Sequence, residues 1–382
     1  MVSKIKRQLA SLPTLAKAAL LLLTLLLLLA AILLPIFLIP RHRREQPLPP
    51  ATPPGDNCST AANGGAVAFD FSPFLVKYRT GCVHRMDGTE RVPAGVDAAT
   101  GVTSKDVVID PDTGLAARMY LPPPSAAGKT KDDLLPVLVF YHGGAFVIMS
   151  PFEPKYHAYL NALVAKARVV AVSVDYRLAP EHPLPAAYDD SWAALNWVAR
   201  NAAAGPEPWL RDRGNLSRLY LAGDSAGANV AHNMAMRAGN GSELDGGAAI
   251  TGVLLLDPYF WGKRPVGAET TDPATRRRYE ATWSFVCAGR YGIDDPRIDP
   301  LATPPAELRR LACSRVAVTV SGLDDFEARG KAYAAALNDS GWAGEVVQYE
   351  TAGERHVYFL DAPASPKSAK ELAFAAGYLS RE

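Results

Sequence analysis

From about residue 107 onward, short apolar runs alternate with longer stretches of helical periodicity. The short runs are rich in β-branched side chains, which is typical of strands buried on both faces. They lie at 137–141, 169–174, 219–222, 253–256, 316–320 and 346–349. Helical spacing of apolar residues occurs at 156–167, 186–203, 226–238 and 326–337, and in a last stretch from Ser365-Pro366 to about 379. This alternation predicts an α/β fold with a mainly parallel central sheet and helices on both faces.

A sharp turn between a predicted strand and a predicted helix follows the run at 219–222. Residues 223–227 read GDSAG. The two glycines leave room for a strained elbow and for close packing of the strand against the helix. We therefore expect the hydroxyl of Ser225 at an exposed apex, with the N–H of Ala226 beside it, which makes Ser225 a candidate nucleophile. The alternative is a polar turn that merely opens a helix.

A glycine pair comes directly after an earlier predicted strand, in the segment that begins at His142. Two adjacent N–H groups that no Cβ obstructs can converge on one oxygen, which is how an oxyanion hole is built. Gly143 and Gly144, together with Ala226, are the predicted donors, and His142 is interpreted as a residue that orients the loop. Phe146, a little further on, would either line a pocket or fill the core.

Two further loops supply the partners that a nucleophilic serine needs. Asp324 and His356 come shortly after the last two predicted strands. The chain order serine, acid, histidine, with each residue on a loop after a strand of one sheet, is the order of α/β hydrolases. We predict that His356 accepts the proton of Ser225 and that Asp324 fixes the imidazole tautomer. Asp325 and Asp257 remain alternatives for the acid.

The N-terminal part of the chain has a different pattern. Residues 18–40 contain no charged side chain, and a helix of that length, at about 1.5 Å per residue, would cross the roughly 30 Å hydrocarbon layer of a bilayer. A cleaved signal peptide is the rival interpretation, but its apolar core is usually about 7–15 residues long. We therefore predict a transmembrane helix within a membrane anchor at 1–44, a proline-rich linker at 45–65 and a folded domain at 66–382.

The flanking charges predict a single-pass membrane protein. Basic residues before the span slightly outnumber those after it, which favours a catalytic domain in the lumen of the secretory pathway, with a cytosol-facing domain as the alternative. The domain would open with aromatic residues at 69–78, which either dock on the core or cover an apolar cleft.

Overall charge and cysteine content exclude several classes of protein. The chain has 40 basic and 39 acidic residues, a net charge of +1, so no nucleic-acid partner is predicted. Cys58, Cys82, Cys287 and Cys313 are scattered and form no C-x-x-C pair, which argues against a metal site and a dense disulfide scaffold. Free or buried thiols are favoured, although a Cys58–Cys82 bridge stays open for a lumenal domain. No metal or other cofactor is predicted.

Through these motifs, residues 66–381 resemble the plant carboxylesterase family, the hormone-sensitive-lipase-like branch of α/β hydrolases that also contains gibberellin receptors. The matching segments are 142–144 (HGG), 175–181 (DYRLAPE), 223–227 (GDSAG), 295–297 (DPR) and 353–356 (GERH). The resemblance implies an α/β-hydrolase fold with a small helical cap formed from about 66–105 and 259–302.

The resemblance also bears on individual site residues. In the family the acid is followed by a short spacer and Arg-Gly, which Arg329-Gly330 match, and this selects Asp324 over Asp325. By analogy the cap shapes the substrate pocket. The candidate substrate-binding residues are Phe146, Tyr259, Trp261 and Phe285.

The predicted function is a serine carboxylesterase that hydrolyses small to medium carboxylic esters through an acyl-enzyme. A small-molecule ester and, through the N-terminal helix, a membrane are the expected partners. One alternative is a non-catalytic, hormone-like receptor on the same fold, but the family's receptors have lost the histidine that His356 provides here. The other alternative is an enzyme that converts esters into lactones with an intact triad. The family's dehydratase has threonine at the position of Ser225.

Overall fold

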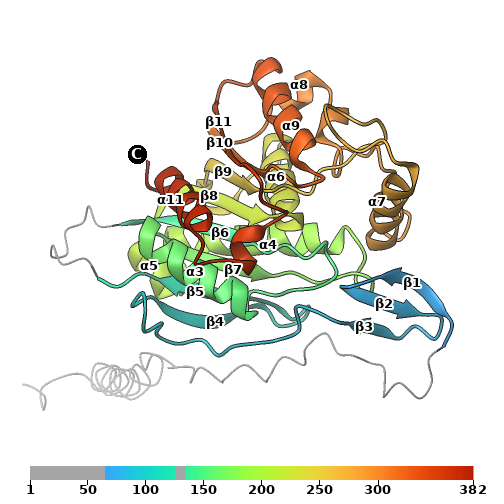
Figure 1. Cartoon of the computed structure of the whole chain (residues 1–382). Helices are drawn as coiled ribbons and strands as arrows, with labels where there is room; N and C mark the ends of the chain where they lie inside the picture. Colours follow the sequence, from blue (N-terminus) through green and yellow to red (C-terminus); the bar gives the residue numbers. More distant parts are fainter. Residues whose placement is uncertain (1–64, 125–133, 382) are drawn as a thin grey trace, which may run out of the picture. The chain divides into compact units, whose positions relative to one another are not determined.

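The computed structural model describes residues 65–124 and 134–381 (Figure 1). Within them, eight strands form the central sheet in the order β11-β10-β9-β8-β6-β7-β5-β4. Neighbouring strands are parallel from β11 to β7, whereas β5 pairs antiparallel with β7 and β4 antiparallel with β5. The strands are β4 Thr103–Asp110, β5 Leu115–Leu121, β6 Leu135–Tyr141, β7 Val170–Asp175, β8 Gly214–Asp224, β9 Ile250–Leu256, β10 Arg315–Ser321 and β11 Glu345–Thr351. The predicted α/β-hydrolase sheet is confirmed.

Helices cover both faces of this sheet (Figure 1). Five helices correspond to the stretches of helical periodicity in the sequence: α3 Pro154–Ala167, α4 Ala186–Ala204, α6 Ala226–Gly239, α9 Glu327–Asp339 and α11 Pro366–Ser380. Three shorter helices lie between them along the chain: α5 Pro208–Arg213, α8 Pro305–Leu308 and α10 Tyr358–Asp361. Side chains alternate along a strand, so successive residues pack on opposite faces of the sheet. Val137 and Val139 belong to the core beneath α4, α6 and α9, while Leu138 and Phe140 belong to the core beneath α3 and α11.

The antiparallel hairpin β4–β5 was not predicted, because its pattern is interrupted by charge. Arg118 lies in the middle of β5 and is 1% exposed. Its Nε donates to Asp106 of β4 over 2.7 Å, which neutralises the buried guanidinium. Because a charged residue of such a buried ion pair interrupts the apolar run, the strand lacks the pattern from which strands were predicted.

The cap is partly sheet, which corrects the prediction of a helical cap. Strands β1 Val67–Phe71, β2 Leu75–Tyr78 and β3 Val83–Arg85 form an antiparallel sheet of their own, and the helix α7 Pro273–Val286 supplies the second part. The β-branched and aromatic residues of these short segments favour pleated pairing over helix. Phe69 of β1 stacks on Phe285 of α7, with ring centroids 4.0 Å apart, and so joins the two parts.

The cysteines divide into two kinds. Cys287 and Cys313 are free thiols, whereas Cys82, close to β3, is disulfide-bonded. Cys58, the other end of the bridge that the sequence left open, lies outside the described residues.

The prediction of a single-pass membrane protein is corrected. Across 65–124 and 134–381, every helix is either too short or too polar to cross a bilayer. Even α4, with its 19 residues, is amphipathic and exposes Asp189 and Arg200. The predicted transmembrane helix at 18–40, the anchor 1–44 and nearly all of the linker 45–65 lie outside the described residues. Neither the membrane partner nor the lumenal orientation is retained.

Candidate active site

Ser225 lies in a strained turn between β8 and α6. Its φ of 51° and ψ of −118° are values that a residue with a side chain rarely adopts. The flanking glycines make the turn sterically possible: a Cβ on Gly227 would collide with the carbonyl oxygen of Tyr141, and one on Gly223 with the backbone of Gly227. The predicted turn therefore forms and places Ser225 at the carboxyl edge of the sheet, but Ser225 is only 7% exposed and does not stand at the exposed apex that the sequence predicted.

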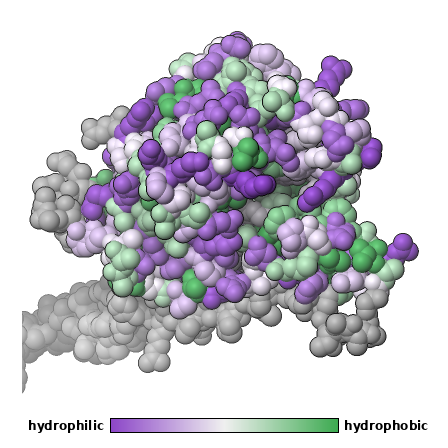
Figure 2. Space-filling view, in the orientation of Figure 1, coloured by the Kyte–Doolittle hydropathy of each residue, from purple (hydrophilic) through white to green (hydrophobic). Residues whose placement is uncertain are grey.

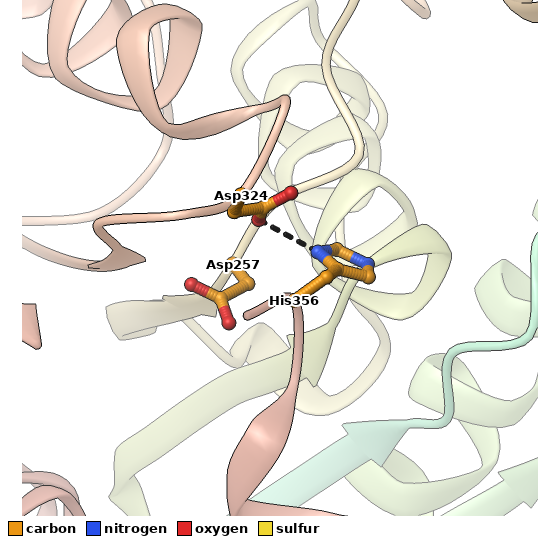
Figure 3. A group of neighbouring side chains, drawn as sticks. All are labelled: Asp257, Asp324 and His356. Carbon is orange, nitrogen blue, oxygen red and sulfur yellow. Dashed lines mark hydrogen bonds and ion pairs between the residues drawn. The ribbon is translucent and has the colours of Figure 1, made fainter. Parts of the chain in front are cut away.

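The structure brings the three predicted catalytic residues together from three loops. The Nε2 atom of His356 lies 2.8 Å from the hydroxyl oxygen of Ser225. Its Nδ1 atom lies 2.7 Å from Oδ2 of Asp324, the contact drawn as a dashed line in Figure 3. An imidazole protonated on Nδ1 satisfies both contacts, because it donates to the carboxylate and accepts from the hydroxyl.

The two alternative acids point elsewhere. Oδ2 of Asp325 accepts a hydrogen bond of 2.6 Å from the hydroxyl of Tyr279 on α7. Asp257 accepts hydrogen bonds from the backbone N–H of Val357 and from the hydroxyl of Ser321, not from the imidazole. The side chain of Asp324 is only 3% exposed, so its contact with the ring is shielded from water.

The electrostatic surroundings make His356 a strong base. Burial lowers the pKa of its imidazole, but the charge of Asp324, the hydrogen bond to it and the charges of Asp257 and Asp224 outweigh burial and raise the pKa to about 9. The ring therefore holds its second proton below about pH 9, and it is the neutral imidazole that can accept a proton from a hydroxyl.

The segment 142–149 contacts the elbow through a buried polar network. The N–H of Gly143 donates to the hydroxyl of Tyr156 over 2.8 Å and to Oδ1 of Asp224 over 3.1 Å. The hydroxyl of Tyr156 donates in turn to Oδ2 of Asp224 over 2.8 Å. The N–H of Gly143 is therefore engaged behind the site, whereas Gly144 and Ala145 line the cavity in front of Ser225.

Sequence reasoning missed Ala145 and the residues that support it. Ala145 was not among the predicted donors, yet it lines the cavity, and its φ of 51° is in the left-handed region that glycine usually occupies. Tyr156 was placed on a helix without a role. Burial raises the pKa of Asp224 to about 7, and its hydrogen bonds with Tyr156 and Gly143 oppose that rise.

A cavity of about 530 Å³ lies over Ser225. Of the predicted substrate-binding residues, Tyr259 lines it. Phe146 and Trp261 do not, because both are wholly buried in the core, and Phe285 is instead stacked against Phe69. The larger apolar side chains that do line the cavity are Phe71, Phe74, Ile148, Met149, Leu323, Phe326, Val357 and Leu360. Figure 2 shows hydrophobic residues gathered over the side of the molecule formed by β1–β3.

Comparison with known proteins places this geometry in a family. Residues 138–360 match the family model described as alpha/beta hydrolase fold. Probable carboxylesterase 2 of Arabidopsis thaliana is 45% identical over 297 residues, which cover 78% of this chain and 91% of the relative. The chain belongs to the plant carboxylesterase family.

A second plant enzyme and a solved bacterial esterase are also similar to this plant carboxylesterase-family protein. Tuliposide A-converting enzyme 1, chloroplastic, of Tulipa gesneriana is 43% identical over 327 residues, which cover 85% of this chain and 79% of the relative. The crystal structure of esterase LipW from Mycobacterium marinum superimposes with a TM-score of 0.59 at 26% identity and covers 74% of this chain and 82% of that one. The protein is a carboxylesterase-type α/β hydrolase.

One cluster in the carboxylesterase has the composition of a metal site. Among the residues that the structure describes, potential ligand atoms of Asp257, Asp324 and His356 lie within 4.8 Å of one another. Hydrogen bonding accounts for most of these atoms, since the imidazole and Asp324 contact each other and Oδ2 of Asp257 accepts two hydrogen bonds.

Proposed function

We propose that this protein hydrolyses small to medium carboxylic esters through an acyl-enzyme on Ser225. The observation that carries the proposal is the hydrogen-bonded row in which His356 lies 2.8 Å from Ser225 and 2.7 Å from Asp324. His356 takes the serine proton as Oγ attacks the ester carbonyl carbon, and returns it to the departing alcohol. The same imidazole then activates the water that cleaves the acyl-enzyme, while Asp324 stabilises the imidazolium.

The proposed oxyanion hole consists of the N–H groups of Gly144, Ala145 and Ala226. Gly144 and Ala145 line the cavity beside Ser225, and Ala226 begins α6, where N–H groups lack helical acceptors. Gly143, the third donor expected from the sequence, has a supporting role in this proposal, because Tyr156 and Asp224 hold its N–H. Removal of one donor from such a site typically lowers kcat by about 10²–10³-fold.

The cavity supports apolar esters of limited size as substrates. Its volume of about 530 Å³ is within the range of small-molecule sites. Phe71 and Phe74 of the cap face it, together with the apolar side chains around Ser225, so an acyl chain or an aryl alcohol would be removed from water on binding. A small-molecule ester is therefore the proposed partner.

Ester conversion is a second candidate, supported by the 43% identity to Tuliposide A-converting enzyme 1. In that reaction a hydroxyl of the substrate itself, instead of water, would receive the acyl group. The same His356 would activate either nucleophile, so the difference lies in how the substrate folds within the cavity.

The test uses the full chain with p-nitrophenyl acetate, p-nitrophenyl butyrate and a fluorophosphonate probe. We expect turnover and covalent labelling in the wild type, and a loss of about 10³-fold or more of turnover together with all labelling in Ser225→Ala. Ser191→Ala, a change at a buried serine of α4, is the matched control. A wild type that binds a ligand without turnover or labelling would contradict the proposal in favour of a receptor. Mass spectrometry of the products of a hydroxy ester separates acid from lactone.

A further inference from the structure

Asp257 is a buried carboxyl group beside the proposed triad that the reaction described above does not use. It follows β9, which lies between β8 and β10 in the sheet, so its side chain reaches the edge that also holds Ser225 and Asp324. The residue is 1% exposed. Figure 3 shows it below Asp324 and beside the strand end that leads to His356.

One oxygen of Asp257 ties the histidine loop to the acid loop. Oδ2 accepts hydrogen bonds of 2.8 Å from the N–H of Val357 and from the hydroxyl of Ser321. Val357 directly follows His356 in the chain, and Ser321 ends the strand that leads to Asp324. The carboxylate therefore fixes the backbone next to the base and the start of the loop that bears the acid.

The backbone at both ends of this contact is strained. Asp257 has a φ of 43° and Val357 a φ of 47°. The cost is greatest for Val357, because a β-branched side chain rarely takes a positive φ. Such conformations persist only where the surroundings hold them, and here the hydrogen bond between the two residues does so.

The other oxygen of Asp257, Oδ1, is buried and has no hydrogen-bond partner within the described residues. An unpaired buried carboxylate oxygen is costly, which favours the neutral acid. Burial accordingly raises the pKa of Asp257 to about 7, against the opposing charge of His356 and with the charges of Asp324 and Glu371 adding to the rise. The charge of this carboxyl group thus depends on whether His356 holds a proton.

We propose that Asp257 is a positioning residue for His356 and places a second carboxyl group, besides Asp324, in the electrostatic field of the imidazole. This inference rests on the proposed hydrolytic mechanism and deepens it. When ionised, Asp257 stabilises the imidazolium that forms as His356 takes the serine proton. In both charge states its oxygen holds the N–H of Val357.

Three further carboxyl groups act on Asp257 and His356, and they come from three elements. Asp324 follows β10, Asp224 ends β8, and Glu371 lies on α11, where it accepts a hydrogen bond of 2.8 Å from Thr319. Asp324, Asp257 and Asp224 all favour the protonated ring of His356. Because Asp257 makes no hydrogen bond to the ring, its charge can be removed without breaking the contact between His356 and Asp324.

The isosteric variant Asp257→Asn separates charge from position. The amide oxygen keeps an acceptor for Val357 and Ser321, but the negative charge is lost. A lost negative charge destabilises the imidazolium, so we expect the pKa of His356 to fall by about one unit. The measurement is an NMR titration of the full chain with 13C-labelled histidines, in which His356→Gln assigns the signal. In ester hydrolysis, the acidic limb of kcat/KM should move to lower pH by the same amount, because the base must be neutral to act.

The variant Asp257→Ala removes the hydrogen bonds as well. We expect kcat to fall about 10–100-fold at every pH, with KM within about twofold, because the base is displaced while the cavity is intact. Should this variant not fold, Ser321→Ala removes one of the two hydrogen bonds and is expected to lower kcat about threefold.

Glu371→Gln is the matched control, since it removes a buried carboxyl group on α11 that contacts Thr319 and Tyr358 but neither Val357 nor Ser321. Its effect on the pKa of His356 should be less than half that of Asp257→Asn. An unchanged pKa of His356 in Asp257→Asn would overturn the electrostatic role, and wild-type kcat in Asp257→Ala and in Ser321→Ala would overturn the positioning role. The NMR titration needs no turnover, so a wild type without esterase activity would refute the proposed function while the titration still decides the role of Asp257.

Discussion

The floor and the cap of the cavity are held by different kinds of contact. The floor consists of the loops 142–149, 224–227, 257–259, 321–326 and 353–357. Strained residues such as Ser225 and Val357 make directional, partly buried hydrogen bonds there. The cap consists of 67–85 and α7, and aromatic contacts dominate it. The ring centroids of Phe71 and Phe74 lie 5.2 Å apart, and the ring of Phe69 stacks on that of Phe285.

Because of this difference, we expect the floor to determine the rate of the chemical step and the cap to determine which esters bind. Hydrogen bonds weaken steeply when their geometry changes, so the floor holds reacting groups in one arrangement. Apolar contacts are non-directional, so the cap can accept esters of various shapes at similar cost. Substitutions in the floor should therefore change kcat, and substitutions in the cap should change KM.

The largest effect is expected from Asp324→Asn in the floor. The amide can no longer hold the Nδ1–H tautomer of His356 or stabilise the imidazolium, so kcat should fall by about 10³–10⁴-fold with little change in KM. Steady-state kinetics with p-nitrophenyl butyrate measures it. Asp325→Asn is the matched control, because Asp325 contacts Tyr279 instead of the imidazole. A larger loss in the control than in Asp324→Asn would assign the acid to Asp325.

A smaller effect is expected at Arg85, which joins the cap to the floor. This buried residue at the end of β3 donates to the carbonyl oxygen of Val147 over 2.6 Å and forms two hydrogen bonds with Glu181. Val147 lies in the loop 142–149, the proposed oxyanion loop, next to the positive-φ residue Phe146. Arg85→Gln should lower kcat about tenfold with KM within about threefold, because the loop relaxes.

The control for Arg85→Gln is Arg79→Gln, a change at an exposed arginine in the same N-terminal segment. Thermal unfolding measured alongside the kinetics separates two roles. A lower melting temperature with wild-type kcat would show that Arg85 stabilises the fold without positioning the oxyanion loop.

The smallest effect is expected in the cap, from Phe74→Ala. Its side chain lines the cavity, so its loss should remove about 1 kcal/mol of contact with a long acyl chain and raise KM about fivefold for p-nitrophenyl octanoate. The acetate should barely respond, because it is too short to reach the cap. Phe69→Ala, on the same small sheet but away from the cavity, is the comparison. Equal changes in KM for acetate and octanoate would contradict the division between floor and cap.

Much of the floor could be predicted because its residues follow strands directly. Ser225, Asp324 and His356 each come shortly after a periodic apolar run, and parallel strands bring their carboxyl ends to one edge. The cap was predicted less well. Its strands are short, and Phe285 engages Phe69 across the cap instead of facing the cavity, a pairing that no local pattern specifies.

The sequence by itself determined the α/β-hydrolase sheet, the elbow and the chain order of the three predicted catalytic residues, because periodicity and turn chemistry act over a few neighbouring positions. The choice between the adjacent carboxylates Asp324 and Asp325 came from family resemblance, and the tertiary structure showed that Asp324 meets the imidazole while Asp325 contacts Tyr279. Only the tertiary structure decided that the N–H of Gly143 is taken by Tyr156. It also placed Asp257 beside His356. These outcomes depend on hydrogen-bond partners from distant elements, and the direction in which a side chain points toward such a partner is set by packing, not by its own neighbours in the chain.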